Sequence, residues 1–262
     1  MAAPQLKIVT SAADAKRPVI EIAGVSKTYR TRDGEVPSLR PLDFSVDQGE
    51  FLVVVGPSGC GKSTLLKMLA GLLPPSAGEI RVQGRVVTRP HSDVGIVFQS
   101  PLLLPWRSVF QNVMMPVEVK GLPRKVYAER AHALLKMVGL AAFEDKYPYQ
   151  LSGGMQQRAS ICRALVHDPK IVLMDEPFGA LDAMTRERMN VELQRIQRET
   201  QKTVLLITHS IPEAVFLADR VLVMSERPGA IAAVYDVKLP RPRSLDVLSD
   251  PGFVQLTQTI RR

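Results

Sequence analysis

Apolar runs of strand length recur along the chain and alternate with segments of helical periodicity. Three runs are continuous and rich in Val, Ile and Leu, over residues 51–55, 171–174 and 204–207. Such runs are typical of strands that are buried on both faces of a parallel sheet. Helices are expected to follow the first run over 63–72 and the second over 183–199. This alternation of strand and helix predicts an α/β fold with right-handed crossovers.

Two other regions have different patterns. Apolar and polar positions alternate within 19–46, which predicts half-exposed strands, with a turn signal at 31–34. Strand signals vanish between about 104 and 166, where 124–138 carries apolar residues on one helical face, so a helical subdomain is expected to be inserted there. We therefore divide the chain into a loose lead-in, a main domain and a tail that packs on it, at 1–18, 19–226 and 227–262.

Composition leaves several functions open. Hydrophobic residues make up 45% of the 262 positions, enough for a substantial core, and the net charge of +8 suits nucleic acid, anionic lipid, nucleotide phosphates or plain solubility. Cys60 and Cys162 have no metal-ligand spacing, so a reducing compartment without disulfides is expected. No apolar run approaches the roughly 20 residues of a spanning helix, and signal-peptide features are lacking, so a role at a membrane requires a spanning partner.

A phosphate-binding loop is predicted directly after the first buried strand. Gly56, Pro57, Ser58, Gly59, Cys60, Gly61, Lys62, Ser63 and Thr64 fit the pattern G-x-x-x-x-G-K-[ST]. Backbone N–H groups of such a loop surround a β-phosphate, Lys62 reaches the β- and γ-phosphates, and the Ser63 hydroxyl can bind Mg²⁺. Cys60 is either a reactive thiol or simply a small loop residue, and we favour the second reading.

An acidic pair ends the second buried strand. Asp175 is expected to face Mg²⁺, and Glu176 is placed to take a proton from an attacking water as general base. Charged strand ends are common in α/β folds, so this pair gains weight only from the phosphate loop upstream of it.

The segment Leu151-Ser152-Gly153-Gly154 predicts a second anion-binding helix start. Ser152 is a good N-cap, and the two glycines leave backbone amides exposed. One ATP cannot easily occupy two such sites on one chain unless they lie on opposite faces, and a dimer is the economical solution. A dimer is therefore expected, in which each ATP lies between one copy's phosphate loop and the other copy's Ser-Gly-Gly helix.

With this segment the sequence resembles the ATP-binding-cassette (ABC) ATPases, whose signature is Leu-Ser-Gly-Gly. The likeness covers about 20–225 and departs at Met155, where the family most often has Gln. It implies a cassette with a RecA-like parallel-sheet core, an N-terminal antiparallel β-subdomain and a helical insert. It also implies roles for four further residues: Tyr29 stacking on adenine, Gln99 touching Mg²⁺ and sensing the attacking water, Asp182 in the loop crossing the dimer interface, and His209 contacting the γ-phosphate.

The resemblance implies an ATPase that uses ATP and Mg²⁺ and works as a homodimer. Its predicted catalytic residues are Lys62, Gln99, Glu176 and His209, and its predicted metal-binding residues are Ser63, Gln99 and Asp175. A free-standing cassette resembles those of bacterial importers, which implies permease subunits as direct partners and a periplasmic or lipoprotein solute-binding protein as an indirect one. The expected location is the cytoplasmic face of the inner membrane.

A soluble cassette ATPase acting on nucleic acid or ribosomes is the alternative. DNA-repair relatives carry long coiled coils between the phosphate loop and the signature, for which 62–152 is too short, and translation-factor relatives carry two cassettes. The basic residues form no patch interleaved with aromatics, so nucleic acid is not expected as a partner.

Short segments suggest a branch of the importers. Residues 103–106, 225–229 and 239–243 look like those of the nitrate, sulfonate and taurine branch. Residues 101–106 are expected to line the groove that receives a permease helix, although Trp106 could equally be a core residue.

Overall fold

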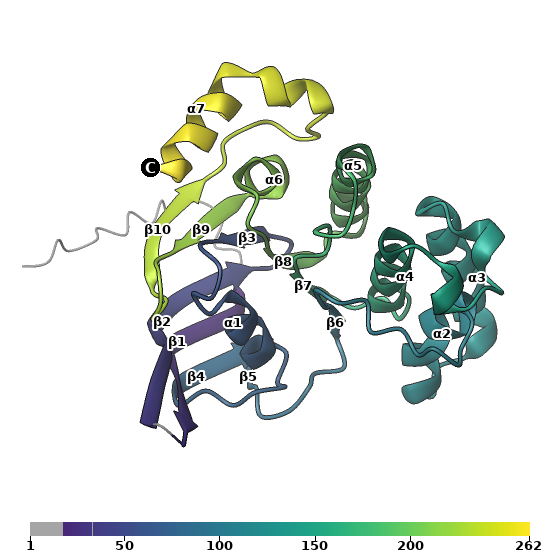
Figure 1. Ribbon diagram of the computed structural model, residues 1–262, viewed down its shortest axis with the longest axis horizontal. Coiled ribbons are helices and arrows are strands. Elements are labelled where there is room, and N and C mark those ends of the chain that lie inside the picture. Colours follow the sequence, from purple (N-terminus) through teal and green to yellow (C-terminus); the bar gives the residue numbers. More distant parts are fainter. Residues whose placement is uncertain (1–17, 33) are drawn as a thin grey trace, which may run out of the picture.

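The computed structural model describes residues 18–32 and 34–262, so most of the expected lead-in lies outside the described residues. Two sheets organise the chain (Figure 1). The first has the order β2-β1-β4-β5 and is antiparallel, with strands β1 (Pro18–Thr31), β2 (Gly34–Asp47), β4 (Ala77–Val82) and β5 (Arg85–Val86). This sheet is the antiparallel β-subdomain that the family resemblance implies, and the alternating pattern within 19–46 predicts its strands β1 and β2 but not β4 and β5.

The second sheet has six strands in the order β10-β9-β3-β8-β7-β6. Its strands are β3 (Phe51–Val55), β6 (Val94–Val97), β7 (Ile171–Asp175), β8 (Thr203–Ile207), β9 (Arg220–Met224) and β10 (Ile231–Asp236). All pair in parallel except β10, which runs antiparallel to β9. The three continuous apolar runs of the sequence are β3, β7 and β8, and all their residues are buried. The predicted α/β fold is therefore confirmed.

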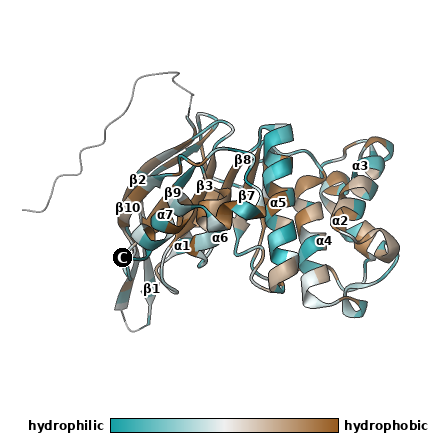
Figure 2. Cartoon of the chain, turned by 90° about the horizontal axis from the view of Figure 1, so that it is seen from above, coloured by the Kyte–Doolittle hydropathy of each residue, from teal (hydrophilic) through white to brown (hydrophobic). Residues whose placement is uncertain are grey.

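The second sheet separates two hydrophobic cores because successive side chains of a strand point to opposite faces. Leu52 and Val54 of β3 join the core beneath the first sheet and helix α1 (Lys62–Leu69), whereas Phe51, Val53 and Val55 join the core beneath the remaining helices. Figure 2 shows hydrophobic residues concentrated along the buried strands and polar ones on the outer side of the long helix α5 (Ala183–Thr200). The predicted site residues lie at the ends of the buried strands of this second sheet.

A helical insert lies at the β6–β7 side of the sheet (Figure 1). It comprises α2 (Val109–Val119), α3 (Arg124–Met137) and α4 (Gly153–Leu165), with short 3₁₀ turns at Ala141–Phe143 and Pro148–Gln150. Ser108 and Gln111 form a capping box that starts α2. The loss of strand signals in this part of the sequence thus corresponds to a real change of architecture.

The C-terminal segment extends the sheet and then covers helix α6 (Ile211–Leu217). After β10 the chain forms a 3₁₀ helix at Leu245–Ser249 and helix α7 (Pro251–Arg261), and Figure 1 shows α7 above α6. Arg243 anchors this segment: its side chain is 3% exposed and donates to five backbone carbonyls, those of Val215, Phe216, Ala218, Val237 and Leu239. Among the described residues, no helix is long and apolar enough to span a membrane.

Candidate functional site

The predicted site residues collect at the carboxyl edge of the parallel sheet. The phosphate loop follows β3, Gln99 follows β6, Asp175 ends β7 with Glu176 next to it, and His209 follows β8. Loops at this edge are where open α/β sheets bind ligands. Parallel topology therefore brings together residues that are more than a hundred positions apart in the sequence.

The phosphate loop has a backbone that only glycine adopts easily. Gly59 and Gly61 have φ of 77° and 104°, and Gly61 caps α1 without any side-chain hydrogen bond. The first N–H groups of α1 therefore remain able to bind an anion. Lys62 is 6% exposed, and its Nζ donates to the carbonyl oxygens of Gly56 and Pro57 at 2.8 Å each. Its ammonium group is thus held inside the curve of the loop.

The loop after β9 packs tightly against the phosphate loop. Gly229 exchanges backbone hydrogen bonds with Ser38 and Arg40, and a Cβ added at Gly229 would lie 2.0 Å from the carbonyl oxygen of Cys60. Cys60 itself is buried, which fits a packed loop residue better than a reactive thiol. This packing brings Arg227, whose Nε donates to the Pro37 carbonyl at 3.3 Å, to the rim of the phosphate loop.

A polar pocket of about 400 Å³ lies over this loop. Tyr29 stands at its edge, 36% exposed, with its hydroxyl 3.2 Å from the Thr64 Oγ1. Two lining residues, Ser38 and Arg227, were missed by sequence reasoning, because neither belongs to a local motif. The full lining is Tyr29, Ser38, Ser58, Gly59, Gly61, Lys62, Ser63, Thr64, Gln99, Glu176 and Arg227.

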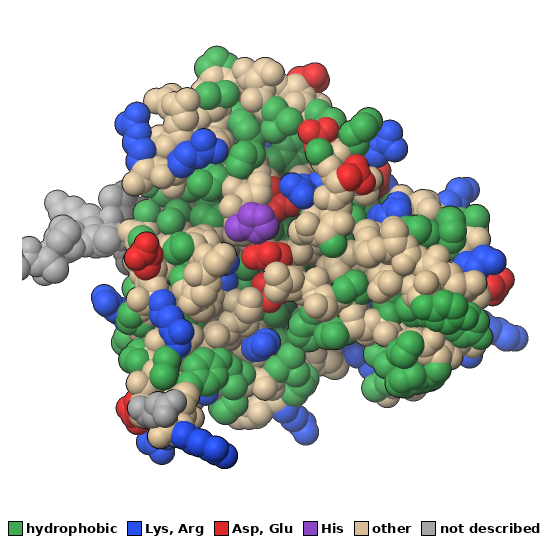
Figure 3. Space-filling model, in the orientation of Figure 1, with side chains coloured by type: hydrophobic (Ala, Val, Ile, Leu, Met, Phe, Trp, Pro, Cys, Tyr) green, Lys and Arg blue, Asp and Glu red, His purple; other side chains and the backbone are tan. Residues whose placement is uncertain are grey.

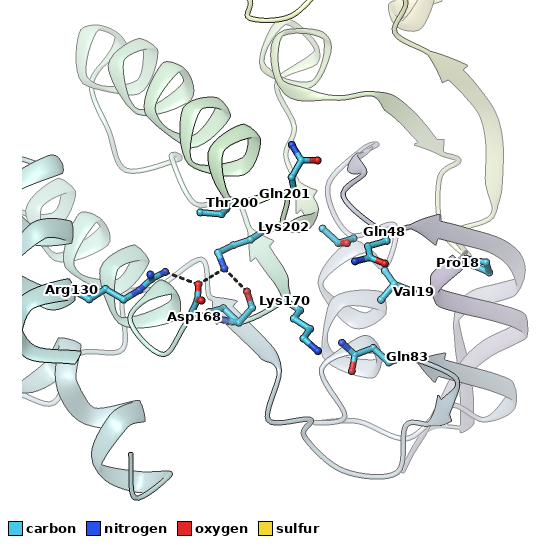
Figure 4. A pocket seen from close by; sticks show the side chains of 12 residues that line it. Pro18, Val19, Gln48, Gln83, Arg130, Asp168, Lys170, Thr200, Gln201 and Lys202 are labelled. Atoms are coloured by element: carbon cyan, nitrogen blue, oxygen red, sulfur yellow. Dashed lines mark hydrogen bonds and ion pairs between the residues drawn. The ribbon is translucent and has the colours of Figure 1, made fainter. Parts of the chain in front are cut away.

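A larger cavity of about 680 Å³ lies at the opposite, amino edge of the strands, next to the ion pairs of Asp168 (Figure 4). None of the predicted site residues lines it. Size alone therefore does not identify the site, and we assign the chemistry to the smaller pocket, where the predicted residues meet.

The acidic pair has two distinct environments. Asp175 is 6% exposed. Burial raises the pKa of its carboxyl group, and a hydrogen bond from the Ser63 side chain acts to lower that pKa. Its Oδ1 has no hydrogen-bond partner among the described residues. Glu176 has a positive φ of 44°, a conformation that is strained for a residue other than glycine and is often found at active sites.

Three predicted residues meet at the Glu176 carboxylate. Its Oε2 accepts from the Gln99 Nε2 at 3.3 Å and lies 3.4 Å from the His209 Nδ1. The His209 side chain is 62% exposed and the Glu176 side chain 21%, so this group is accessible from solvent. Figure 3 shows a histidine side chain beside acidic ones in the middle of the visible face. A carboxylate flanked by an amide and an imidazole is suited to orienting and deprotonating a water.

The signature segment lies outside this pocket. Ser152 caps α4, with its Oγ accepting from the Met155 N–H at 3.3 Å, and Ser152 and Gly153 are exposed. Asp182 caps α5 by accepting from the Thr185 N–H at 3.0 Å; this hydrogen bond lowers the pKa of its carboxyl group. None of these three residues, nor Gly154, lines the pocket over the phosphate loop. One copy of the chain does not join the two anion-binding elements.

Helix α4 is nevertheless connected to the catalytic loops. Gln157 is buried and its Nε2 donates to the carbonyl of Phe98, the residue before Gln99, at 3.0 Å. A Cβ added at Gly154 would lie 3.0 Å from Leu181, in the loop that leads to Asp182. A movement of α4 is therefore expected to displace both the loop that carries Gln99 and the loop that leads to Asp182.

Comparison with known proteins identifies the family. Residues 39–179 match the family model described as ABC transporter. A taurine import ATP-binding protein of Rhizobium johnstonii is 45% identical, over 93% of this chain and 95% of that protein. The chain belongs to the ABC transporter family. It is an ATP-binding and ATP-hydrolysing cassette of the importer type.

Further relatives of this ABC cassette agree with the importer branch expected from the sequence. A nitrate import ATP-binding protein of Synechocystis is 42% identical over 92% of this chain and 93% of the relative. The dimeric structure of a bacterial ABC transporter cassette matches with a TM-score of 0.77 and 32% identity, covering 84% of this chain and all of that one. A dimeric post-hydrolysis state bound to ADP and phosphate matches with a TM-score of 0.77 and 31% identity, with the same coverage. The alternative of a cassette acting on nucleic acid or ribosomes is not favoured.

The ABC cassette also carries an apolar groove of about 520 Å³ between α2 and β6. Leu102 lines it and is 59% exposed, and the Arg163 side chain beneath donates to the carbonyls of Pro101 and Leu102. Trp106 is 69% exposed, so the core interpretation of this residue is wrong, and it does not line this particular groove.

Proposed function

We propose that this chain is the motor subunit of an importer in which two copies close over two ATP molecules. One observation carries the proposal: Gln99, Glu176 and His209 meet beside the phosphate loop, whereas the Ser152 helix start does not line that pocket. The site becomes complete when a second copy supplies Ser152, Gly153 and Gly154 to the γ-phosphate. Asp182 then lies at the interface between the two copies.

In this proposal the nucleotide is held by residues at fixed positions on the rigid sheet edge. Tyr29 stacks on adenine, the loop from Gly56 to Thr64 surrounds the phosphates, and Lys62 turns its ammonium group from the loop carbonyls to the β- and γ-phosphates. Arg227 reaches the same pocket and adds a positive charge at its rim. Binding energy is thus directed to positioning the γ-phosphate.

Glu176 takes the proton of the attacking water in this mechanism. Gln99 orients that water, and His209 donates a hydrogen bond toward the γ-phosphate, so charge developing there is stabilised by groups already in place. Ser63, Gln99 and Asp175 would hold Mg²⁺: they offer oxygen ligands, and the unpartnered, buried Oδ1 of Asp175 fits a cation. When bound, the metal neutralises phosphate charge.

The apolar groove between α2 and β6 is the proposed docking site for a cytosolic helix of a permease. Its lining connects through Phe98 and Leu102 to the loop that carries Gln99, so closure at the nucleotide reaches the permease. The cassette then works at the cytoplasmic face of the inner membrane, with a solute-binding protein contacting the permease outside. The relatives' names favour a small solute such as a sulfonate, nitrate or bicarbonate as cargo.

Replacing Glu176 by Gln tests the catalytic assignment. The variant keeps the shape of the side chain but cannot accept a proton, so ATP hydrolysis is expected to fall by about 10²- to 10⁴-fold while ATP binding persists. Size-exclusion chromatography with ATP is expected to show a stable dimer of the variant. Normal turnover by Glu176→Gln would remove this residue from the general-base role.

Co-purification tests the membrane assignment. The tagged chain is extracted from its own cells in mild detergent, and bound proteins are identified by mass spectrometry. A multi-spanning permease is expected, and replacing Leu102 by Asp is expected to lower its recovery because a charge in the apolar groove opposes docking. Recovery of only ribosomal or DNA-repair proteins contradicts the importer role.

A further inference from the structure

Glu213 is a buried carboxylate beside the catalytic residues for which the mechanism above has no use. It is 7% exposed, and its Oε1 has no hydrogen-bond partner among the described residues. A buried carboxylate oxygen without a hydrogen-bond partner is costly, so the position of Glu213 requires an explanation.

Helix capping does not supply that reason. Ser210 and Glu213 have the Ser-x-x-Glu spacing of a capping box, in which the Glu side chain accepts from the backbone N–H of the Ser. Here the Ser210 N–H donates to the Thr208 Oγ1 at 3.0 Å instead. Only the reverse half of the box is present, with the Ser210 Oγ accepting from the Glu213 N–H at 3.4 Å. The Glu213 carboxylate is therefore directed elsewhere.

The carboxylate instead faces the catalytic centre. Glu213 lines one small hollow together with Glu176, His209, Arg186 and Thr208, the residue before His209. The charged groups around it are Arg186 and Glu187 from α5, Glu176 after β7, and His209 after β8. Burial raises the pKa of Glu213, and the Thr208 hydroxyl and the Arg186 guanidinium act against that rise.

Arg186 connects Glu213 to the second anion-binding element. Its guanidinium donates to the Phe178 carbonyl at 3.3 Å and to the Leu181 carbonyl at 2.9 Å, so it holds the loop that ends at Asp182. Leu181 packs closely against Gly154 of the signature segment. Glu213 thus lies beside both the turn that carries His209 and Arg186, which holds the loop that packs on the signature.

We propose that Glu213 is a positioning residue for ATP hydrolysis. It fixes the position of Arg186 relative to the turn that carries His209, so that the loop 178–182 and His209 are both aligned with the γ-phosphate. It acts through Arg186 and Thr208 and touches no reacting atom. The proposal rests on the catalytic site assigned above. The negative charge of Glu213, and not only the volume of its side chain, is needed for this role.

The test compares steady-state ATP hydrolysis by the full chain and by Glu213→Gln, which has the same shape without the charge. We expect kcat to fall by about tenfold to a hundredfold, with ATP affinity changed by less than about twofold, because alignment and not binding is lost. Glu213→Asp keeps the charge and is expected to recover part of kcat. The matched control is Glu187→Gln on the neighbouring turn of α5, which is expected to leave kcat unchanged.

Two further readouts separate positioning from a merely structural role. Protonating Glu213 mimics the Gln variant, so kcat of the original chain is expected to fall more on mild acidification than kcat of Glu213→Gln. Arg186→Gln is expected to lose kcat similarly, and the double variant is expected to be no worse than Arg186→Gln alone, since both act on one path.

The outcomes are distinct. Unchanged kcat in Glu213→Gln, or additive losses in the double variant, overturns the proposal. If Glu213→Gln does not fold, normal kcat in Arg186→Gln overturns it and loss of kcat with unchanged ATP affinity supports it. Retained turnover in Glu176→Gln, in contrast, rejects the catalytic site itself and identifies that failure separately.

Discussion

At the scale of single residues, the phosphate loop depends on a close contact with a distant glycine. Gly229 lies directly against the Cys60 carbonyl, and its own N–H and C=O bind β2. No side chain fits there without moving backbone. The geometry of the loop therefore depends on a residue that belongs to no nucleotide-binding motif.

Replacing Gly229 by Ala is expected to weaken ATP binding by about tenfold, because its Cβ would push the phosphate loop away and overpacking of this kind costs about 1–3 kcal/mol. Fluorescence titration with a labelled nucleotide measures the effect. Gly252→Ala, in α7 and far from the pocket, is the control and is expected to bind like the original chain. Equal affinity of Gly229→Ala would show that the loop relaxes without cost.

At the scale of elements, one carboxylate links the helical insert to the sheet. Figure 4 shows Asp168 between Arg130 of α3 and Lys202, the residue before β8, and its Oδ1 lies 2.8 Å and 2.6 Å from their nitrogens. Burial acts to raise the pKa of Asp168, but the two cations outweigh it and the pKa is lowered. Lys202 is 5% exposed, so it depends on this partner.

Asp168→Asn is expected to lower the free energy of unfolding by about 1 kcal/mol, a modest value because the carboxylate is half exposed. The lowered pKa means that this contribution is present above the ordinary value of 3.8 and is lost as the pH falls through the folded-state pKa. Urea denaturation at neutral pH and below pH 3.8 measures the difference, which is expected to shrink in acid. Asp236→Asn, on the exposed face of β10, is the control; an equal loss there would show that the ion pairs are not responsible.

The sequence predicts an element well when a pattern of neighbouring residues indicates which of its side chains are buried. Residues 51–55 are apolar on both faces, and β3 has these bounds. Ser152 and Asp182 are good N-caps and start α4 and α5. By contrast, Arg227 reaches the pocket through pairing with residues near Pro37, and no local pattern reports such a distant contact. Glu213 misleads in the other way, since the Ser-x-x-Glu spacing fits a full capping box, of which the structure forms only the Ser210 half.

At the scale of the whole molecule, the C-terminal segment holds α6, the helix that follows His209 and carries Glu213. Arg243 satisfies carbonyls at the end of α6, and Gln194 of α5 is hydrogen-bonded to the Arg243 backbone at 2.6 Å and 3.1 Å. Burial lowers the pKa of Arg243 to about 10, so it remains charged at neutral pH. The C-terminal segment is therefore hydrogen-bonded to α5 and to α6, the helix that follows His209.

Arg243→Ala is expected to lower the free energy of unfolding by about 3 kcal/mol, because several buried carbonyls lose their donor. For a chain of this size the melting temperature is expected to fall by roughly 5–10 °C. Arg243→Lys is expected to recover only part of this, since an ammonium group cannot reproduce the planar fork of donors. Differential scanning calorimetry measures the change, with the exposed Arg261→Ala as the control. A shift as small as that of the control would contradict the anchoring role.

The antiparallel pairing of β10 has a consequence for truncated forms of the chain. Without β10, the apolar strand β9 would present a row of free N–H and C=O groups along an open sheet border. Such a border is a template for strands from other molecules. Shortening the chain before residue 231 is therefore expected to make it prone to edge-to-edge aggregation, even with every nucleotide-binding motif intact.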